Sequence, residues 1–144
     1  MNDRFTLIEI INRSIQYLID KGVPNPKCDV EWIISHVTRK KKLDLYLEFE
    51  NLVEKNDVEK IRSCIVKRGK RIPLQHILGR VNFAGNEIIC DQRALIPRPE
   101  TEYFTELIKE KLNTNFQGTI LDLGTGSGVI IITLCINNDK CIGI

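Results

Sequence analysis

A glycine-rich turn at residues 124–128 carries the residue types most able to bind a small-molecule ligand. Its sequence is Gly-Thr-Gly-Ser-Gly, and it follows Asp122 between two apolar stretches. A strand that ends at such a turn and leads into a helix presents backbone N–H groups at the carboxyl edge of a sheet. Because glycine has no Cβ, it permits a tight turn at Gly124, close approach of a ligand at Gly126, and packing of helix against strand at Gly128. The candidate ligand-binding residues are therefore Asp122, Gly124, Thr125, Gly126, Ser127 and Gly128.

The spacing of these glycines favours one cofactor. Dinucleotide-binding folds prefer G-x-G-x-x-G, which serves a pyrophosphate, whereas this loop is G-x-G-x-G followed by Val129 and Ile130. The difference favours S-adenosylmethionine, whose ammonium can meet an acid such as Asp122 while its carboxylate lies near the loop amides. Two alternatives stay open, namely a glycine turn of purely structural use and a nucleotide-binding site.

A second unusual stretch, Leu-Ile-Pro-Arg-Pro-Glu-Thr-Glu, occupies residues 95–102. Pro99 has the fixed φ that suits the first position of a helix, and Glu100 and Glu102 favour the positive end of the helix dipole. Helix chemistry thus explains the prolines and the acids. It leaves Arg98 unexplained, so this arginine is a further candidate for a functional role.

Composition and isolated residues exclude several other classes of protein. The 144 residues are 42% hydrophobic and 28% charged with a net charge of +2, which is typical of an ordinary globular chain. The five cysteines form no C-x-x-C pair, which indicates free thiols in a reducing cytosol. The histidines lie far from any cysteine, and no apolar run approaches the ~20 residues of a membrane span. We therefore expect a cytoplasmic protein without a metal site.

An amphipathic helix is predicted from Thr6 to about Lys21, where apolar residues recur at helical spacing. Thr6-x-x-Glu9 has the pattern of a capping box, and Gly22 is placed to end the helix. A second helix should end near the basic run at residues 39–42. After a short third segment, a further helix is expected to start at Asn56 and to be capped through Asn56-x-x-Glu59. The first seventy residues are thus predicted to be all helical.

The character of the chain changes at Pro73. Residues 81–90 read as two strands around Gly85-Asn86, a dipeptide that supplies the positive φ of a two-residue hairpin turn. A helix should follow from about Pro99 to Leu112. Thereafter the pattern predicts the beginning of a βαβ unit: a short buried strand at 119–123, a helix at 129–136 and a second strand starting at 141.

Three stretches occur together in this order: RIPLQHILGRVNFAG at 71–85, LIPRPETE at 95–102 and ILDLGTGSG at 120–128. Together they resemble the HemK-type peptide chain release factor glutamine methyltransferases. Residues 1–70 are similar to the helical N-terminal domain of that family in pattern only. The resemblance implies transfer of a methyl group from S-adenosylmethionine to the side-chain amide nitrogen of the glutamine in the Gly-Gly-Gln motif of release factors.

The resemblance also implies a fold class, which is α + α/β. A small helical domain at 1–72, expected to recognise the substrate, would precede a β-hairpin and the first βαβ unit of a Rossmann-like methyltransferase domain within 73–144. Residues 95–102 would lie beside the cofactor pocket, where Arg98 or Glu102 would contact the methionine moiety or brace the glycine loop. The expected partner is a release factor, and the protein is expected to be a monomer that contacts neither nucleic acid nor membrane.

One element of the family pattern is missing. The Asn-Pro-Pro-Tyr motif, whose asparagine accepts from the substrate amide, does not occur in these 144 residues, so no catalytic residue is assigned. The acid that should hold the ribose hydroxyls, expected ~20 residues after the glycine loop, is also absent. We therefore expect an N-terminal fragment with an intact helical domain and an incomplete, inactive methyltransferase domain.

Two other functions remain open from the sequence. Residues 1–72 could dock a protein partner in a chain that does no chemistry. The chain could also be a fragment of a nucleic-acid amino-methyltransferase, because adenine N6 enzymes pair a glycine loop with an Asn-Pro-Pro-aromatic motif. The stretches at 73–79 and 95–102 argue against this last case. The basic clusters at 39–42 and 67–71 have acids close by and are expected to be solvated surface.

Overall fold

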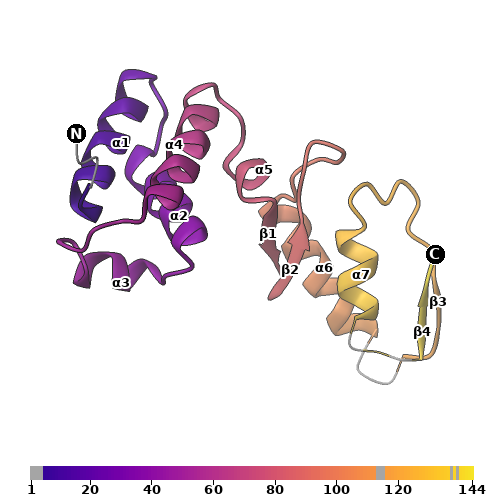
Figure 1. The fold of residues 1–144 in the computed structure, drawn as a ribbon. Coiled ribbons are helices and arrows are strands. Elements are labelled where there is room, and N and C mark those ends of the chain that lie inside the picture. Colours follow the sequence, from indigo (N-terminus) through magenta and orange to yellow (C-terminus); the bar gives the residue numbers. More distant parts are fainter. Residues whose placement is uncertain (1–4, 113–115, 137, 139) are drawn as a thin grey trace. The chain divides into compact units, whose positions relative to one another are not determined.

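The computed structural model of the chain describes residues 5–112, 116–136, 138 and 140–144. They belong to two compact units, residues 1–78 and residues 79–144, each of which is described by itself. The described part of the first unit is helical, and that of the second combines two helices with two small sheets (Figure 1). This order confirms the predicted succession of a helical part, a hairpin and a βαβ unit.

The first helix, α1 (Leu7–Asp20), begins where the sequence predicts. Thr6 is its N-cap: the Thr6 hydroxyl accepts from the Glu9 N–H at 3.4 Å, and the Glu9 carboxylate accepts from the Thr6 N–H at 2.9 Å. After the helix, Gly22 takes a left-handed conformation with φ of 66°. The predicted capping box and the predicted stop are both confirmed.

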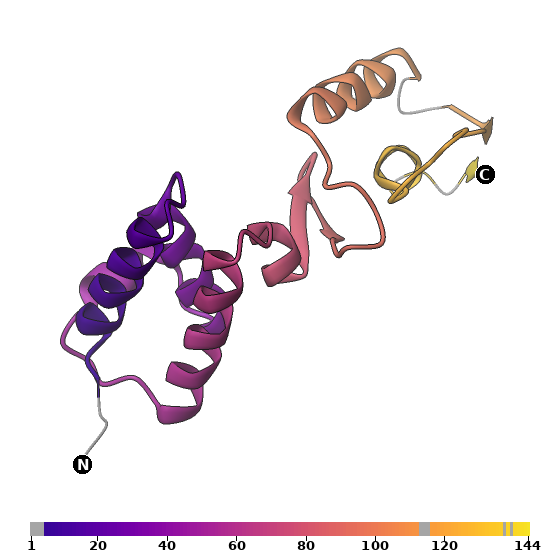
Figure 2. The same ribbon diagram turned by 90° about the horizontal axis from the view of Figure 1, so that it is seen from above.

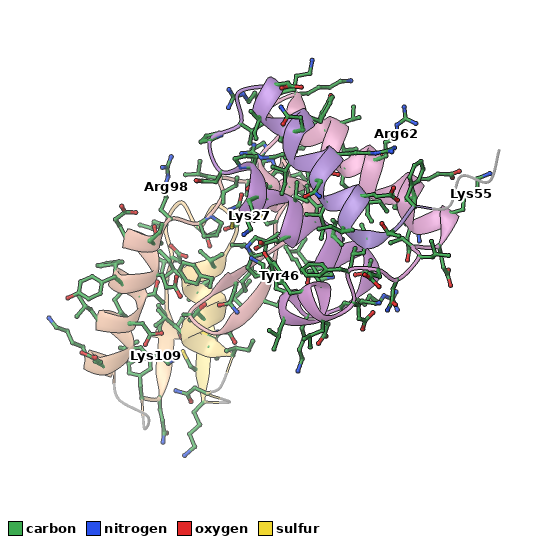
Figure 3. The ribbon with its side chains drawn as sticks, turned by 90° about the vertical axis from the view of Figure 1, so that its left-hand side faces the viewer. Lys27, Tyr46, Lys55, Arg62, Arg98 and Lys109 are labelled. Atoms are coloured by element: carbon green, nitrogen blue, oxygen red, sulfur yellow. The ribbon has the colours of Figure 1, made fainter. Side chains whose placement is uncertain are left out.

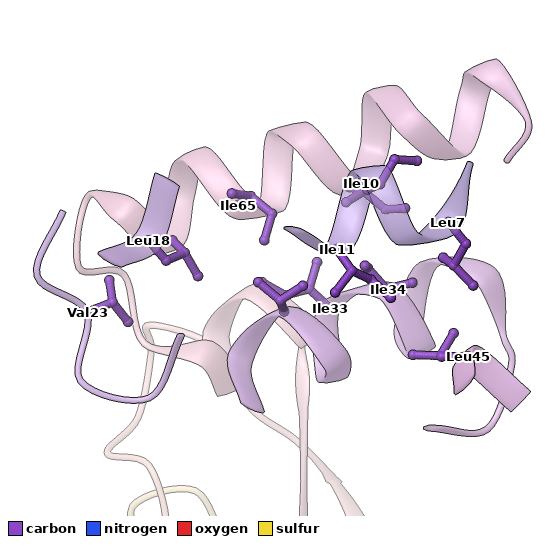
Figure 4. Close-up of a cluster of buried hydrophobic side chains, with 11 residues drawn as sticks. Leu7, Ile10, Ile11, Leu18, Val23, Ile33, Ile34, Leu45 and Ile65 are labelled. Atoms are coloured by element: carbon purple, nitrogen blue, oxygen red, sulfur yellow. The ribbon is translucent and has the colours of Figure 1, made fainter. Parts of the chain in front are cut away.

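The core of the first unit lies between α1, α2 (Pro26–Thr38) and α4 (Lys55–Gly69), with the short α3 (Lys42–Leu47) beside α2. Figure 2 shows these helices from above, and Figure 4 shows their buried side chains pointing toward one another. Each helix contributes a face of aliphatic residues spaced three or four positions apart, so the faces close on one another. The buried cluster consists of Leu7, Ile10, Ile11, Leu18, Val23, Val30, Ile33, Ile34, Leu45, Ile61 and Ile65.

The start of α4 differs from the prediction. The helix begins at Lys55 with Glu54 as its N-cap, and no side chain caps it. Asn56 therefore lies inside the first turn, and the predicted cap is wrong. The cause is tertiary, because the segment just before the helix pairs with the start of the chain: the Val53 N–H donates to the Phe5 carbonyl at 3.0 Å. That pairing sets the entry of the chain into α4.

A nearly buried ion pair ties α2 to α4. The Arg68 Nε donates to the Asp29 carboxylate at 2.6 Å, and the Arg68 Nη1 donates to the Ile72 carbonyl at 3.0 Å. The side chains of Arg68 and Asp29 are only 16% and 10% exposed. The last helix of this unit, α5 (Leu74–Leu78), packs against α4 and α2. The first unit therefore runs to Leu78, beyond the boundary at residue 72 that the sequence suggests.

The second unit begins with a hairpin of β1 (Arg80–Phe83) and β2 (Asn86–Ile89), paired antiparallel with Phe83 opposite Asn86. Its two turn residues are Ala84 and Gly85, with φ of 48° and 77°. The predicted hairpin is confirmed, but the turn lies one residue earlier than the expected Gly85-Asn86. Asn86 instead starts β2, and its side-chain amide donates to the Ala84 carbonyl at 3.1 Å.

After α6 (Pro99–Leu112), whose bounds match the prediction, comes the βαβ unit of β3 (Gly118–Ile120), α7 (Val129–Cys135) and β4 (Cys141–Gly143). The two strands pair in parallel, with Gly118 opposite Cys141. The ladder continues past the strands, because the Ile144 N–H donates to the Ile120 carbonyl at 2.9 Å. The larger Rossmann-like sheet remains a prediction.

The second unit buries much less apolar surface. Its buried cluster contains Phe83, Ile88 and Val129. The prediction that residues 119–123 form a buried strand is wrong: Thr119 is exposed, and Leu121 and Leu123 are 62% and 85% exposed. β3 ends at Ile120, so Thr119 and Ile120 are the residues of the predicted range that lie in the strand. Burial depends on neighbouring elements, and within the described residues α7 packs beside β4 without covering these leucines.

Candidate functional site

The predicted glycine loop connects the end of β3 to the start of α7. Gly124, Gly126 and Gly128 all have positive φ, at 78°, 58° and 77°. Residues with a Cβ adopt this region only with strain, so the alternation of glycine with other residues in the loop matches the alternation of its backbone conformation. The Gly128 N–H donates to the Thr125 carbonyl at 2.9 Å, which closes the last turn before α7.

The surroundings of each loop glycine show what a Cβ at that position would meet. A Cβ at Gly124 would have no heavy atom within 4 Å, and one at Gly126 would meet the Gly124 carbonyl at 3.9 Å. These two positions therefore face open space, as a ligand-binding loop requires. At Gly128, a Cβ would lie 3.2 Å from the Cδ1 of Ile132, within the same helix. The glycine there relieves crowding inside α7, rather than between helix and strand as expected.

The acid at the start of the loop is held in place. The Thr125 hydroxyl donates to Asp122 Oδ2 at 2.9 Å, and the Asp122 N–H donates to the Ile144 carbonyl at 2.8 Å. Both bonds orient a partly exposed carboxylate at the mouth of the loop. Within the described residues, the backbone N–H groups of 124–127 donate to no protein group, and the Ser127 hydroxyl is not hydrogen-bonded. Acceptors on a ligand could use these donors.

The stretch at 95–102 contacts the hairpin through Glu102. Glu102 Oε1 accepts from the Ala84 N–H at 2.7 Å, which holds the left-handed hairpin turn against α6. The Arg98 carbonyl accepts from the Thr101 and Glu102 N–H groups at 3.0 and 3.2 Å, which starts α6 at Pro99. The Arg98 side chain extends outward from this point (Figure 3). Neither side chain is hydrogen-bonded to the glycine loop among the described residues.

Sequence reasoning missed two contacts around the candidate site. The bond from Thr125 to Asp122 had a signal, since acceptor and hydroxyl donor lie three residues apart across a turn. The bond between Glu102 and Ala84 had none, because the two residues are 18 positions apart and belong to different elements.

The described residues hold no cluster of three or more His, Cys, Asp or Glu side chains placed to bind a metal ion. None of the helices in the same part of the chain has both the length and the hydrophobicity of a bilayer-crossing segment.

Comparison with known proteins identifies the first unit. Residues 9–79 match the family described as the PrmC N-terminal domain, and this range ends one residue after the first compact unit. The match therefore begins within the first turn of α1 and includes α2 to α5 in full.

Other relatives align along most of this chain and therefore cover both units. A release factor glutamine methyltransferase of Chlorobaculum tepidum is 34% identical over 137 residues, which are 92% of this chain and 47% of the relative. One from Fusobacterium nucleatum is 38% identical over 128 residues, or 88% of this chain and 36% of the relative. One from Geobacter sulfurreducens is 31% identical over 130 residues, or 90% of this chain and 45% of the relative.

These comparisons confirm the resemblance that the motifs indicate. The chain spans about half the length, or less, of these relatives. Residues 9–79 therefore belong to the PrmC N-terminal domain family, and the chain as a whole is a sequence relative of the release factor glutamine methyltransferases.

Proposed function

We propose that this protein serves S-adenosylmethionine-dependent methylation of the glutamine side-chain amide in the Gly-Gly-Gln motif of release factors. The observation that carries the proposal is the similarity, along about nine-tenths of the chain, to several proteins named release factor glutamine methyltransferase. The motifs at 71–85, 95–102 and 120–128 support the same assignment, because they resemble that family in order and spacing.

The glycine loop is the proposed cofactor site. The open surface at Gly124 and Gly126 and the oriented carboxylate of Asp122 fit the methionine end of S-adenosylmethionine, which carries one ammonium and one carboxylate. When bound, this cofactor supplies an electrophilic methyl group on its sulfonium. Asp122 would accept from the ammonium, and the N–H groups of residues 124–127 would donate to the carboxylate. The exposed Arg98 guanidinium is a further candidate for that carboxylate.

The first unit is the proposed recognition domain for the release factor, and we propose that the protein acts as a cytoplasmic monomer. An amide nitrogen is a poor nucleophile because its lone pair is delocalised, so the reaction depends on acceptors that hold the NH₂ in line with the methyl group. The family provides them with Asn-Pro-Pro-Tyr, which these 144 residues lack. We therefore expect the chain by itself to be inactive, and we assign it no catalytic residue.

A hybrid enzyme tests the proposal directly. Residues 1–144 would replace the matching segment of the Chlorobaculum tepidum relative, and methyl transfer from labelled S-adenosylmethionine to a release factor would be measured. We expect incorporation that disappears when the Gly-Gly-Gln glutamine of the release factor is changed to alanine. An Asp122→Ala hybrid should transfer methyl at least ~10-fold more slowly, since it loses a charge-assisted hydrogen bond to the cofactor. A folded hybrid that methylates DNA or RNA instead would contradict the assignment.

A non-catalytic docking role is the second candidate. The contrast between the closed core of residues 1–78 and the open surface of residues 79–144 favours it, because the first unit is complete enough to bind a partner without chemistry. Calorimetric titration of the 144-residue chain separates the two functions. Binding of a release factor without any binding of S-adenosylmethionine would favour docking, whereas binding of S-adenosylmethionine with low-micromolar affinity would favour the cofactor site.

A further inference from the structure

Two cysteines of the βαβ unit lie close enough to form a disulfide with each other. Cys135 is the last residue of α7, Cys141 is the first residue of β4, and their Sγ atoms are 3.3 Å apart, joined by an S–H···S hydrogen bond. All five cysteines of the chain are free thiols in this structure. We propose that Cys135 and Cys141 form a dithiol site that is oxidised to an intramolecular disulfide by a small disulfide such as glutathione disulfide. This inference is independent of the proposed methyl transfer.

Hydrogen bonds of Asn138 link the end of α7 to the start of β4. The Asn138 N–H donates to the Cys135 carbonyl at 3.0 Å, and the Cys141 N–H donates to the Asn138 carbonyl at 3.0 Å. The Asn138 side chain adds two bonds: its amide donates to the Phe116 carbonyl at 2.8 Å, and its carbonyl accepts from the Lys140 N–H at 3.1 Å. Asn138 is therefore bonded to both Cys135 and Cys141, and its side chain is bonded to Phe116 and Lys140.

Packing of α7 on β4 also keeps Cys135 and Cys141 close together. A Cβ on Gly143 would lie 2.5 Å from the Ile131 side chain and 3.2 Å from Cys135 Sγ. The strand can approach the helix this closely because residue 143 has no side chain. The parallel pairing of Cys141 with Gly118 then anchors the start of β4 in the sheet. Helix, connection and strand together keep the two sulfur atoms facing each other.

The other thiols lack such a partner. Cys28 is exposed on the surface of α2, and burial raises the pKa of Cys64 and of Cys90, which keeps these thiols protonated. Thiol exchange needs a thiolate, and a protonated, buried thiol reacts slowly. Cys28 can form mixed disulfides with a small thiol, but no neighbouring cysteine is placed to resolve them into an internal bond.

The chemistry of the pair gives the order of steps. Burial, followed by the hydrogen bond with Cys141, raises the pKa of Cys135 to about 11, so this thiol keeps its proton at neutral pH. Cys141 loses its proton and attacks the small disulfide, which forms a mixed disulfide on Cys141 and releases one small thiolate. Cys135 then loses its proton and attacks the Cys141 sulfur, which forms the internal S–S bond and releases the second small thiolate. Two protein thiols are oxidised, and one small disulfide is reduced to two thiols.

The test measures ring closure in the whole 144-residue chain. Cys28, Cys64 and Cys90 are replaced by serine so that the pair alone remains, and the protein is equilibrated with buffers of reduced and oxidised glutathione. Mass spectrometry should show loss of two hydrogens without a glutathione adduct. We expect the equilibrium constant for the internal disulfide to be at least ~10-fold larger in the native buffer than in concentrated guanidinium chloride, because the fold raises the effective concentration of one thiol at the other.

Two variants separate the fold from the short sequence spacing. In the same background, Cys135→Ser with Ile136→Cys moves one thiol to the neighbouring exposed position and should lose the native preference. Asn138→Ala removes the two side-chain bonds that brace the connection and should reduce the preference without abolishing it. Equal equilibrium constants in native buffer and denaturant, or stable glutathione adducts on both cysteines, would overturn the proposal.

Discussion

The two units of this chain differ in how completely their apolar faces are covered. In residues 1–78, eleven buried side chains form one cluster, and five of its members, Leu18, Val30, Ile33, Ile34 and Leu45, are fully inaccessible. In residues 79–144, the buried cluster has three members, while large apolar side chains on α6, α7 and β4 and in the segment after β3 stay exposed. Among them are Tyr103, Phe104, Leu123, Ile132 and Ile142.

The difference shows when amphipathic helices and strands can bury their apolar faces within one small unit. Three helices whose apolar faces meet can close a core within fewer than eighty residues. A two-stranded parallel sheet with one crossover helix leaves faces that need further cover, since parallel sheets are stable when layers of helices protect both sides. We therefore expect the first unit to carry most of the stability of the chain and the second to open at lower cost.

The largest expected effect comes from a cavity in the first unit. Ile33→Ala removes buried methyl groups from a fully inaccessible position and should lower the free energy of unfolding of residues 1–78 by about 2 to 5 kcal/mol. The single tryptophan, Trp32, lies in α2, so its fluorescence in a urea titration reports on this unit.

The matched control lies in the second unit. Ile89 is 76% exposed, so Ile89→Ala should leave the Trp32 transition unchanged. If Ile33→Ala shifted that transition no more than Ile89→Ala, the core of the first unit would not be closed in solution, and the contrast between the units would fail.

The next effect concerns the ion pair between α2 and α4. Asp29→Ala leaves the Arg68 guanidinium nearly buried without its carboxylate, and we expect a loss of about 1 to 3 kcal/mol in the unfolding free energy. Asp57→Ala is the control, because its pairing with the exposed Lys60 should contribute less than about 0.5 kcal/mol. Similar losses for both variants would mean that the pair between Asp29 and Arg68 is solvated.

Much of the fold could be predicted because its signals are local. The capping box of Thr6 and Glu9 and the proline start of α6 at Pro99 each depend on residues within one helical turn. The start of α4 could not be predicted in the same way, because the pairing of Val53 with Phe5 is a contact between distant segments. A locally plausible cap at Asn56 is overridden by that tertiary constraint.

In the candidate site too, local features could be predicted from the sequence and contacts between distant segments could not. The positive φ of the loop glycines follows from a pattern of five residues, and the structure contains it as expected. The partner of Glu102 could not be found from the sequence, because it depends on the hairpin turn occurring at Ala84-Gly85. The exposure of Leu121 and Leu123 could not be predicted from the sequence either, since an apolar pattern does not specify which elements cover it.

A smaller effect tests the interior of the second unit. Thr133 on α7 is 2% exposed, and within the described residues its hydroxyl has no hydrogen-bond partner. Thr133→Val replaces the hydroxyl by a methyl group of similar size and should stabilise α7 by about 0.5 to 1.5 kcal/mol. Slower hydrogen exchange of the α7 amides would show this gain. Thr105→Val on α6 is the control. It deletes the hydroxyl that donates to the Thr101 carbonyl at 2.8 Å, so it should not slow hydrogen exchange of the α6 amides.

The smallest expected effect is a pH dependence at the edge of the first unit. The hydrogen bond from the Thr6 N–H, followed by that from the Thr6 hydroxyl, lowers the pKa of Glu9 from its ordinary value of 4.5. The folded state therefore binds the proton more weakly than the unfolded state, so the capping box stabilises α1 above about pH 4.5 and loses this contribution as the pH falls through the lowered pKa. NMR titration of the Glu9 carboxyl should give a midpoint below 4.5. Thr6→Ala should raise that midpoint only in part, because the backbone N–H, the larger cause, remains. A Glu9 midpoint unchanged by folding would show that the box is open in solution, and the order assigned to the first unit would then not extend to the start of α1.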